Sequence, residues 1–124
     1  MEKIKVISIK TLQDSDQDKL EQFLSGYPET SMFLRSNMKR VGLEYQDKDY
    51  HGDYFAAFDE TDNVTGVIAH YWNGNIMMQA KDQSILSMLI EFFRKAATRP
   101  VAGVLGSDDQ ARTVIDTLCL SGEA

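Results

Sequence analysis

The sequence predicts an α/β (α+β) domain in which a mixed β-sheet, containing an antiparallel meander, is flanked by helices. Two strand-like runs, 64–72 and 75–79, are joined by Asn73-Gly74, a dipeptide typical of a two-residue type I′ hairpin turn. β-branched residues fill a first strand-like run at 4–9, whereas apolar residues after position 84 recur at helical spacing. The expected order of elements is therefore β-α-α-β-β-β-α-β-α.

The first half begins with the strand at 4–9 and continues with two helices. Ser15 followed by Asp18 resembles a capping box and predicts a helix over 15–25 that ends at Gly26. Thr30 or Ser31 can cap the second helix. An apolar stripe and a terminating glycine define the extent of this second helix: Leu34, Met38, Val41 and Gly42.

The meander follows a polar loop at 44–52. Strands 54–58 and 64–72 form a hairpin across a turn at 59–63, and strand 75–79 completes the meander. The next helix carries a wide apolar face, which consists of Ile85, Leu86, Leu89, Ile90, Phe92, Phe93 and Ala96. Pro100 bars its continuation, and 101–105 predicts a short strand. Ser107 and Gln110 resemble a capping box that opens the last helix.

Composition limits the function classes. The chain has 124 residues, of which 43% are hydrophobic, and this suits one globular domain with its own core. Thirteen basic and nineteen acidic residues give a formal charge of −6. Binding to nucleic acid or to an anionic membrane needs a basic face, so we expect neither partner.

Cysteine use and the absence of long apolar runs in the sequence predict a cytoplasmic location. Cys119 is the single cysteine, which excludes an internal disulfide and makes an activated nucleophile improbable without a basic neighbour in sequence. No run approaches the roughly 18 apolar residues of a membrane span, and the start of the chain lacks a signal-peptide core. Met77, Met78 and Met88 do not indicate a metal site, because thioethers alone do not select a metal.

Three phrases of the sequence carry a family resemblance: Glu29-Thr-Ser-Met-Phe-Leu-Arg35-Ser-Asn37, Ala69-His-Tyr-Trp-Asn-Gly-Asn75, and Gly103-Val-Leu-Gly106 with Asp109-Gln110. Together they resemble the amino-terminal, degenerate half of a group of two-part N-acetyltransferases of the GNAT superfamily. The predicted order of elements is also that of the first nine elements of the GNAT fold. The resemblance implies a parent enzyme that transfers an acetyl group from acetyl-CoA to an amine acceptor, either a small molecule or a protein.

The chain departs from the family at the loop that would hold the cofactor. GNAT enzymes bind the pyrophosphate of acetyl-CoA on a glycine-rich loop before the helix that follows the fourth strand, where N–H groups can approach the phosphates. The equivalent stretch, Ala80-Lys-Asp-Gln-Ser84, has no glycine, and Asp82 would repel phosphate. Two further strands of the family fold are missing after Leu120. We therefore expect residues 1–124 to be one amino-terminal domain of a longer chain, with no cofactor of its own and with the catalytic half as its partner.

Four residues are candidates for a pocket or an acceptor-binding surface: Arg35, His70, Tyr71 and Trp72. A histidine titrates near neutrality and suits acid–base work, but one in an apolar strand is also typical of a packed, hydrogen-bonded core residue. The two aromatic residues can stack on a ligand or pin the hairpin. Arg35 can bind a carboxylate or phosphate, or form a surface or interdomain ion pair.

No catalytic, cofactor-binding or metal-binding residue is assigned to this chain. Alongside the acetyltransferase domain, the sequence leaves a second class of function open, a non-enzymatic module with a degenerate GNAT fold that binds a small ligand or a protein. A homodimer is also left open.

Overall fold

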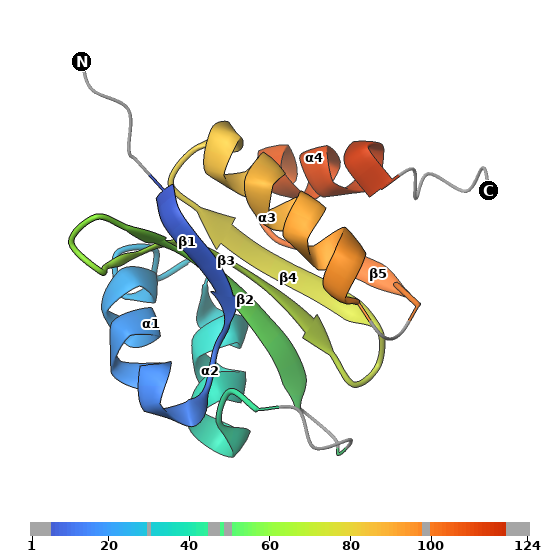
Figure 1. Cartoon of the computed structure of the whole chain (residues 1–124). Coiled ribbons are helices and arrows are strands. Elements are labelled where there is room, and N and C mark those ends of the chain that lie inside the picture. Colours follow the sequence, from blue (N-terminus) through green and yellow to red (C-terminus); the bar gives the residue numbers. More distant parts are fainter. Residues whose placement is uncertain (1–5, 30, 45–47, 49–50, 98–99, 119–124) are drawn as a thin grey trace.

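The computed structural model describes residues 6–29, 31–44, 48, 51–97 and 100–118 (Figure 1). Its elements follow the predicted order, with one 3₁₀ helix, η1, added before the first α-helix. They are β1 (Val6–Thr11), η1 (Asp14–Asp16), α1 (Gln17–Leu24), α2 (Met32–Val41), β2 (Gly52–Asp59), β3 (Val64–Tyr71), β4 (Asn75–Ala80), α3 (Gln83–Ala96), β5 (Gly103–Leu105) and α4 (Asp108–Leu118). The α/β fold class is therefore confirmed.

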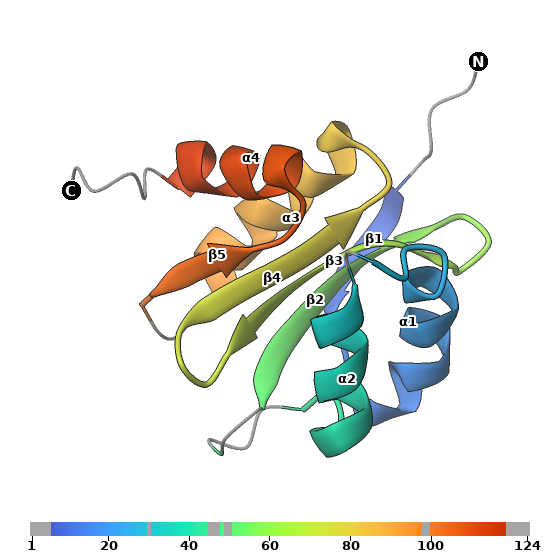
Figure 2. The ribbon, with the colours of Figure 1, turned by 180° about the vertical axis from the view of Figure 1, so that it is seen from behind.

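The five strands form one mixed sheet in the order β1-β2-β3-β4-β5. The first four pair antiparallel, and β5 pairs with β4 in parallel, from Asn75 opposite Gly103 to Met77 opposite Leu105. Helices α1 and α2 cover one face, whereas α3 and α4 cover the other, as the two opposite views show (Figures 1 and 2). The sheet thus lies between two helical layers, and β3 is buried along its whole length.

Each face of the sheet has its own apolar core. Under α1 and α2, core side chains include Leu20, Leu34, Tyr54, Val67 and Tyr71. Under α3 and α4, they include Phe55, Ile68, Leu89, Phe93 and Val114. Odd and even positions of the central strands contribute to opposite cores, as expected for strands covered on both faces.

The predicted type I′ turn at Asn73-Gly74 is wrong. The Gly74 N–H donates to the Tyr71 carbonyl at 2.9 Å, and Gly74 has a φ of 90° whereas Asn73 has no positive φ. Strands β3 and β4 are therefore joined by three residues, 72–74, with glycine in the left-handed position that such loops favour. The hairpin was predicted correctly, but the predicted loop was one residue too short.

Two helix starts differ in detail from the predicted caps. The first helical segment begins at Asp14 as η1, where the Gln13 N–H donates to the Asp16 carboxylate at 2.9 Å, so the predicted Ser15 cap is wrong. Ser31 precedes α2 as predicted, but its hydroxyl donates to the Leu24 and Tyr27 carbonyls at 2.9 and 2.6 Å. It therefore ties α2 to α1 instead of capping α2. Thr30, the alternative cap, lies outside the described residues, as do Ile4 and Cys119.

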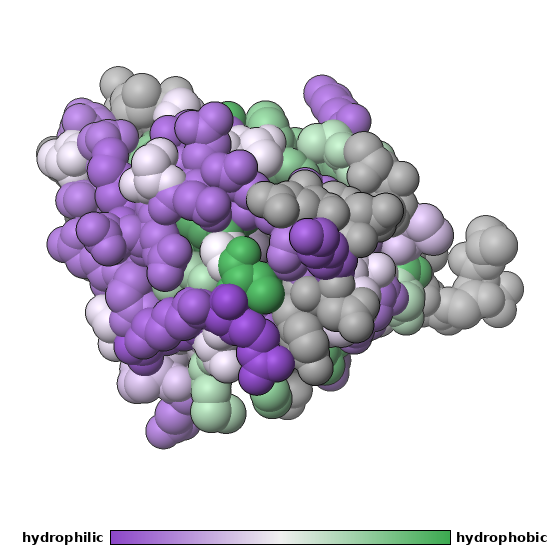
Figure 3. Space-filling model, turned by 90° about the horizontal axis from the view of Figure 1, so that it is seen from below, coloured by the Kyte–Doolittle hydropathy of each residue, from purple (hydrophilic) through white to green (hydrophobic). Residues whose placement is uncertain are grey.

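Large exposed hydrophobic side chains are few among the described residues: Met32, Phe33, Met88 and Leu105. Seen from below, the molecule presents a largely hydrophilic surface on which hydrophobic residues form small, scattered areas (Figure 3). None of the helices within the described part of the chain is long and apolar enough to cross a membrane.

Candidate functional site

The turn between β4 and α3 is the position where the GNAT resemblance would place a phosphate site. Here Asp82 is the N-cap of α3, and its carboxylate accepts the Ile85 N–H at 2.8 Å. The Lys81 N–H donates to the Thr65 carbonyl at 3.0 Å. A carboxylate of the chain itself therefore occupies the helix end that would attract an anion.

The edge of β4 beside this turn is bonded to the side chain of Gln110. The Ala80 N–H donates to Gln110 Oε1 at 3.1 Å, and Gln110 Nε2 donates to the Ala80 carbonyl at 2.9 Å. Gln110 was predicted to complete a capping box with Ser107, but its amide is directed to the sheet. Both backbone groups of Ala80 are therefore bonded to a side chain, beyond Met77, the last residue of β4 recorded in the pairing with β5.

Arg35 lies on α2 and binds a carboxylate of the neighbouring helix. Its Nε lies 3.1 Å from both carboxylate oxygens of Glu21, and its Nη2 lies 2.5 Å from Oε2. The Arg35 hydrogen bonds lower the pKa of Glu21, and the same contacts raise the pKa of Arg35. This pair joins α1 to α2, and both side chains are only partly exposed.

His70 lies on the face of the sheet covered by α3 and is fully buried. Its ring meets Phe93 edge-on at 5.2 Å between centroids, and Nε2 lies 3.2 Å from the Pro100 carbonyl oxygen. The histidine therefore connects β3 to α3 and to the segment that leads into β5.

Tyr71 lies on the opposite face, in the core beneath α1 and α2. Its hydroxyl is 2.8 Å from the Tyr54 hydroxyl, and Asn37 also bonds to it. Burial raises the pKa of Tyr54 to about 12 and raises the pKa of Tyr71 well above its ordinary value. Two neutral phenols thus share a buried hydrogen bond, and Tyr54 is a partner that the sequence pattern did not single out.

Trp72 follows β3 and packs on the same core as Tyr71, with ring centroids 6.4 Å apart. Arg35, His70 and Tyr71 therefore lie in three different surroundings: a helix–helix ion pair, the α3 core and the α2 core. The structure does not bring the four candidate residues into one pocket. Within the described residues there is also no group of three or more His, Cys, Asp or Glu side chains that could hold a metal ion.

Comparisons with known proteins show little similarity to the sequence of this chain. No protein-family model matches the chain, and no curated protein matches its sequence. Among solved structures, the chain is similar to one described as an acetyltransferase of the GNAT family from Staphylococcus aureus Mu50. The two share 14% sequence identity with a TM-score of 0.44, over 93% of this chain and 82% of the other.

Proposed function

We propose that this chain is the non-catalytic, amino-terminal GNAT-like domain of an acetyltransferase, and that acetyl-CoA binding and the chemistry belong to a following half. The proposal depends on the three phrases that resemble the family and on the observed order of elements. The observation that carries its non-catalytic part is the β4–α3 turn, where Asp82 caps α3.

The cap opposes a pyrophosphate for two reasons. The Ile85 N–H is already bonded to a carboxylate, so a phosphate oxygen would have to displace that carboxylate to reach it. The displaced group would still lie beside the phosphate and repel it, because like charges at short distance destabilise each other. A glycine at this position would instead leave N–H groups open to an anion.

The edge of β4 at Ala80 is also occupied by hydrogen bonds within the chain. Acetyl-CoA carries amide groups in the arm between its thioester and its pyrophosphate, and such groups can pair with the edge of a strand. At Ala80 both backbone groups are already bonded to Gln110. A cofactor amide that paired with Ala80 would first have to displace the Gln110 amide, so its pairing would replace two existing hydrogen bonds instead of adding new ones.

The parent reaction can be stated in chemical terms. The acceptor amine attacks the thioester carbonyl, a base takes the proton from the amine, and backbone N–H groups stabilise the oxyanion. The C–N bond forms, the C–S bond breaks, and the thiolate of coenzyme A leaves and takes up a proton. No residue described here is assigned to these roles.

Capture of the native protein tests the proposal. An antibody against this domain is used to isolate it from its source cells, and intact-mass measurement and an acetyl-transfer assay follow. We expect a species that contains this domain together with a further segment and transfers acetyl groups. A native species of this domain alone, whether active or inactive, would overturn the proposal; an inactive one would favour the binding-module alternative.

A further inference from the structure

A cavity of about 380 Å³ lies between α1, the turn that joins β2 to β3, and the turn that joins β4 to α3. Six of its lining residues carry the argument: Lys19, Phe23, Tyr27, Asn63, Val64 and Lys81. The β2–β3 turn lies beside α1 in both opposite views (Figures 1 and 2). This volume falls within the range of small-molecule sites.

One wall of the cavity is apolar and well packed. Phe23 and Val64 are only 7% and 4% exposed, and both belong to the core beneath α1 and α2. The rings of Phe23 and Tyr27 lie 5.2 Å apart at an angle of 54°. Because Phe23 is held by the core, these rings offer a preformed surface for a flat apolar group.

The rim of the cavity carries two lysines from different elements. Lys19 belongs to α1 and pairs with the Asp62 carboxylate, with its side chain 43% exposed. Lys81 belongs to the β4–α3 turn, and its backbone is held by the hydrogen bond to Thr65. Two lysines from different elements thus line one cavity, and each has a carboxylate of the β2–β3 turn near it: Lys19 pairs with Asp62, and the charge of Lys81 contributes to lowering the pKa of Asp59.

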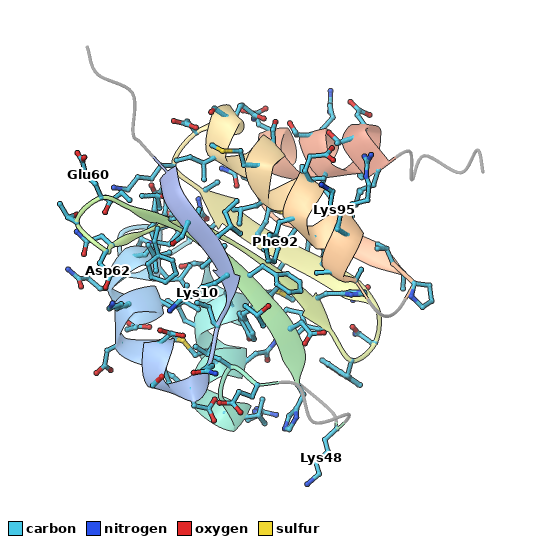
Figure 4. The ribbon with its side chains drawn as sticks, viewed as in Figure 1. Lys10, Lys48, Glu60, Asp62, Phe92 and Lys95 are labelled. Atoms are coloured by element: carbon cyan, nitrogen blue, oxygen red, sulfur yellow. The ribbon has the colours of Figure 1, made fainter. Side chains whose placement is uncertain are left out.

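The β2–β3 turn that borders this cavity is held by its own hydrogen bonds. The Asp59 carboxylate accepts from the N–H groups of Thr61 and Asn63 at 2.9 and 3.0 Å, and from the Thr61 hydroxyl at 2.7 Å. Figure 4 shows Glu60 and Asp62 on this turn, at the α1 side of the molecule. These hydrogen bonds, together with the charge of Lys81, lower the pKa of Asp59. Asn63 therefore has a defined place in the wall.

We propose that this cavity binds a small organic anion, whose carboxylate or phosphate group lies between Lys19 and Lys81 and whose flat apolar part packs on Phe23 and Tyr27. Asp62 competes for Lys19 and Asp59 competes for Lys81, but exposed charge pairs of this kind are weak, so an incoming anion can replace these carboxylates. This inference does not depend on acetyl-CoA chemistry.

A titration followed by ¹H–¹⁵N NMR tests the proposal with four probes. Benzoate and phenyl phosphate carry both an anionic group and a ring, acetate carries only the charge, and benzamide carries only the ring. We expect at least one of the first two to shift cavity amides saturably with a Kd on the order of 1 mM, and acetate and benzamide to bind about tenfold more weakly. The stronger of the two ring-bearing anions identifies the anionic group.

Lysine variants locate the site. Lys81→Gln should weaken binding of the better probe by about fivefold. Lys95→Gln is the matched control, since Lys95 is an exposed lysine of α3 away from the cavity (Figure 4). The proposal is overturned if neither ring-bearing anion saturates, if the shifts lie outside the cavity, or if the two lysine variants weaken binding equally.

Discussion

The side-chain amide of Gln110 continues the sheet beyond β5 by pairing with both backbone groups of Ala80, at 3.1 and 2.9 Å. The backbone pairing of β4 with β5 is recorded only as far as Met77 opposite Leu105. Gln110 lies in the first turn of α4 and reaches back to the last residue of β4. One side chain therefore bonds the strand edge and anchors the last helix.

Replacing Gln110 with leucine should destabilise the fold by about 1–3 kcal/mol, because the buried backbone groups of Ala80 lose two hydrogen bonds. Urea denaturation measures the change. Arg112→Gln, an exposed position on the same helix, is the control and should stay close to wild type. Equal midpoints for Gln110→Leu and the wild type would show that the amide contributes nothing to the sheet.

Replacing Gly74 with alanine should cost roughly 1–3 kcal/mol, because a side chain there is strained at a φ of 90°. The added Cβ would also lie 2.9 Å from the Ala102 Cβ and 3.1 Å from the Pro100 carbonyl oxygen. Gly26→Ala is the matched control, since its Cβ would meet its nearest neighbour at an ordinary 3.5 Å. If both variants unfold at the same denaturant concentration, the conformation of the turn is not as described.

The sequence predicted the hairpin at Asn73-Gly74 but not its length. A glycine next to an asparagine indicates that the chain reverses, whereas the number of loop residues depends on where pairing between β3 and β4 stops. Gly74 is also packed against Ala102, whose N–H donates to the Gly74 carbonyl at 2.8 Å. That contact comes from the segment before β5 and has no signal in the local sequence.

His70→Ala should lower stability by about 1–3 kcal/mol, through the loss of its packing on Phe93 and of its hydrogen bond near Pro100. Acetyl transfer by a longer parent enzyme should stay within a few-fold of wild type, when it is assayed well below the melting temperature. A fully stable variant with a rate about a hundredfold lower, roughly 2.7 kcal/mol of transition-state stabilisation, would instead assign His70 to chemistry.

The buried Tyr54–Tyr71 pair should make the protein lose stability in alkali. Both folded-state pKa values lie above the ordinary value of 10.0, so the folded state binds these protons more tightly than the unfolded state. Their contribution is fully present below about pH 10 and is lost as the pH rises towards the Tyr54 value of about 12.

Urea midpoints at about pH 8 and about pH 11 test this expectation. The double variant Tyr54→Phe with Tyr71→Phe removes both ionisable hydroxyls and keeps both rings, so it should lose less stability than the wild type over this interval. Identical losses in the two proteins would mean that the alkaline effect comes from other groups, such as lysines.

The sequence predicted the fold better than it predicted the surroundings of the candidate site residues. Alternation along a strand already places His70 and Tyr71 on opposite faces, and the two residues do belong to different cores. The pairing of Arg35 with Glu21 depends on how α2 lies against α1, and no local pattern encodes that. The lysines of the cavity come from segments more than sixty residues apart in the chain, so only the folded structure reveals them together.

Calorimetry of this chain with acetyl-CoA tests the central claim most directly. The capped β4–α3 turn and the closed edge of β4 predict no saturable heat at cofactor concentrations up to about 1 mM. Benzoate in the same cell is a useful comparison, because it reports the lysine cavity independently of the cofactor. A micromolar dissociation constant for acetyl-CoA would contradict the account and make this chain a cofactor-binding domain in its own right.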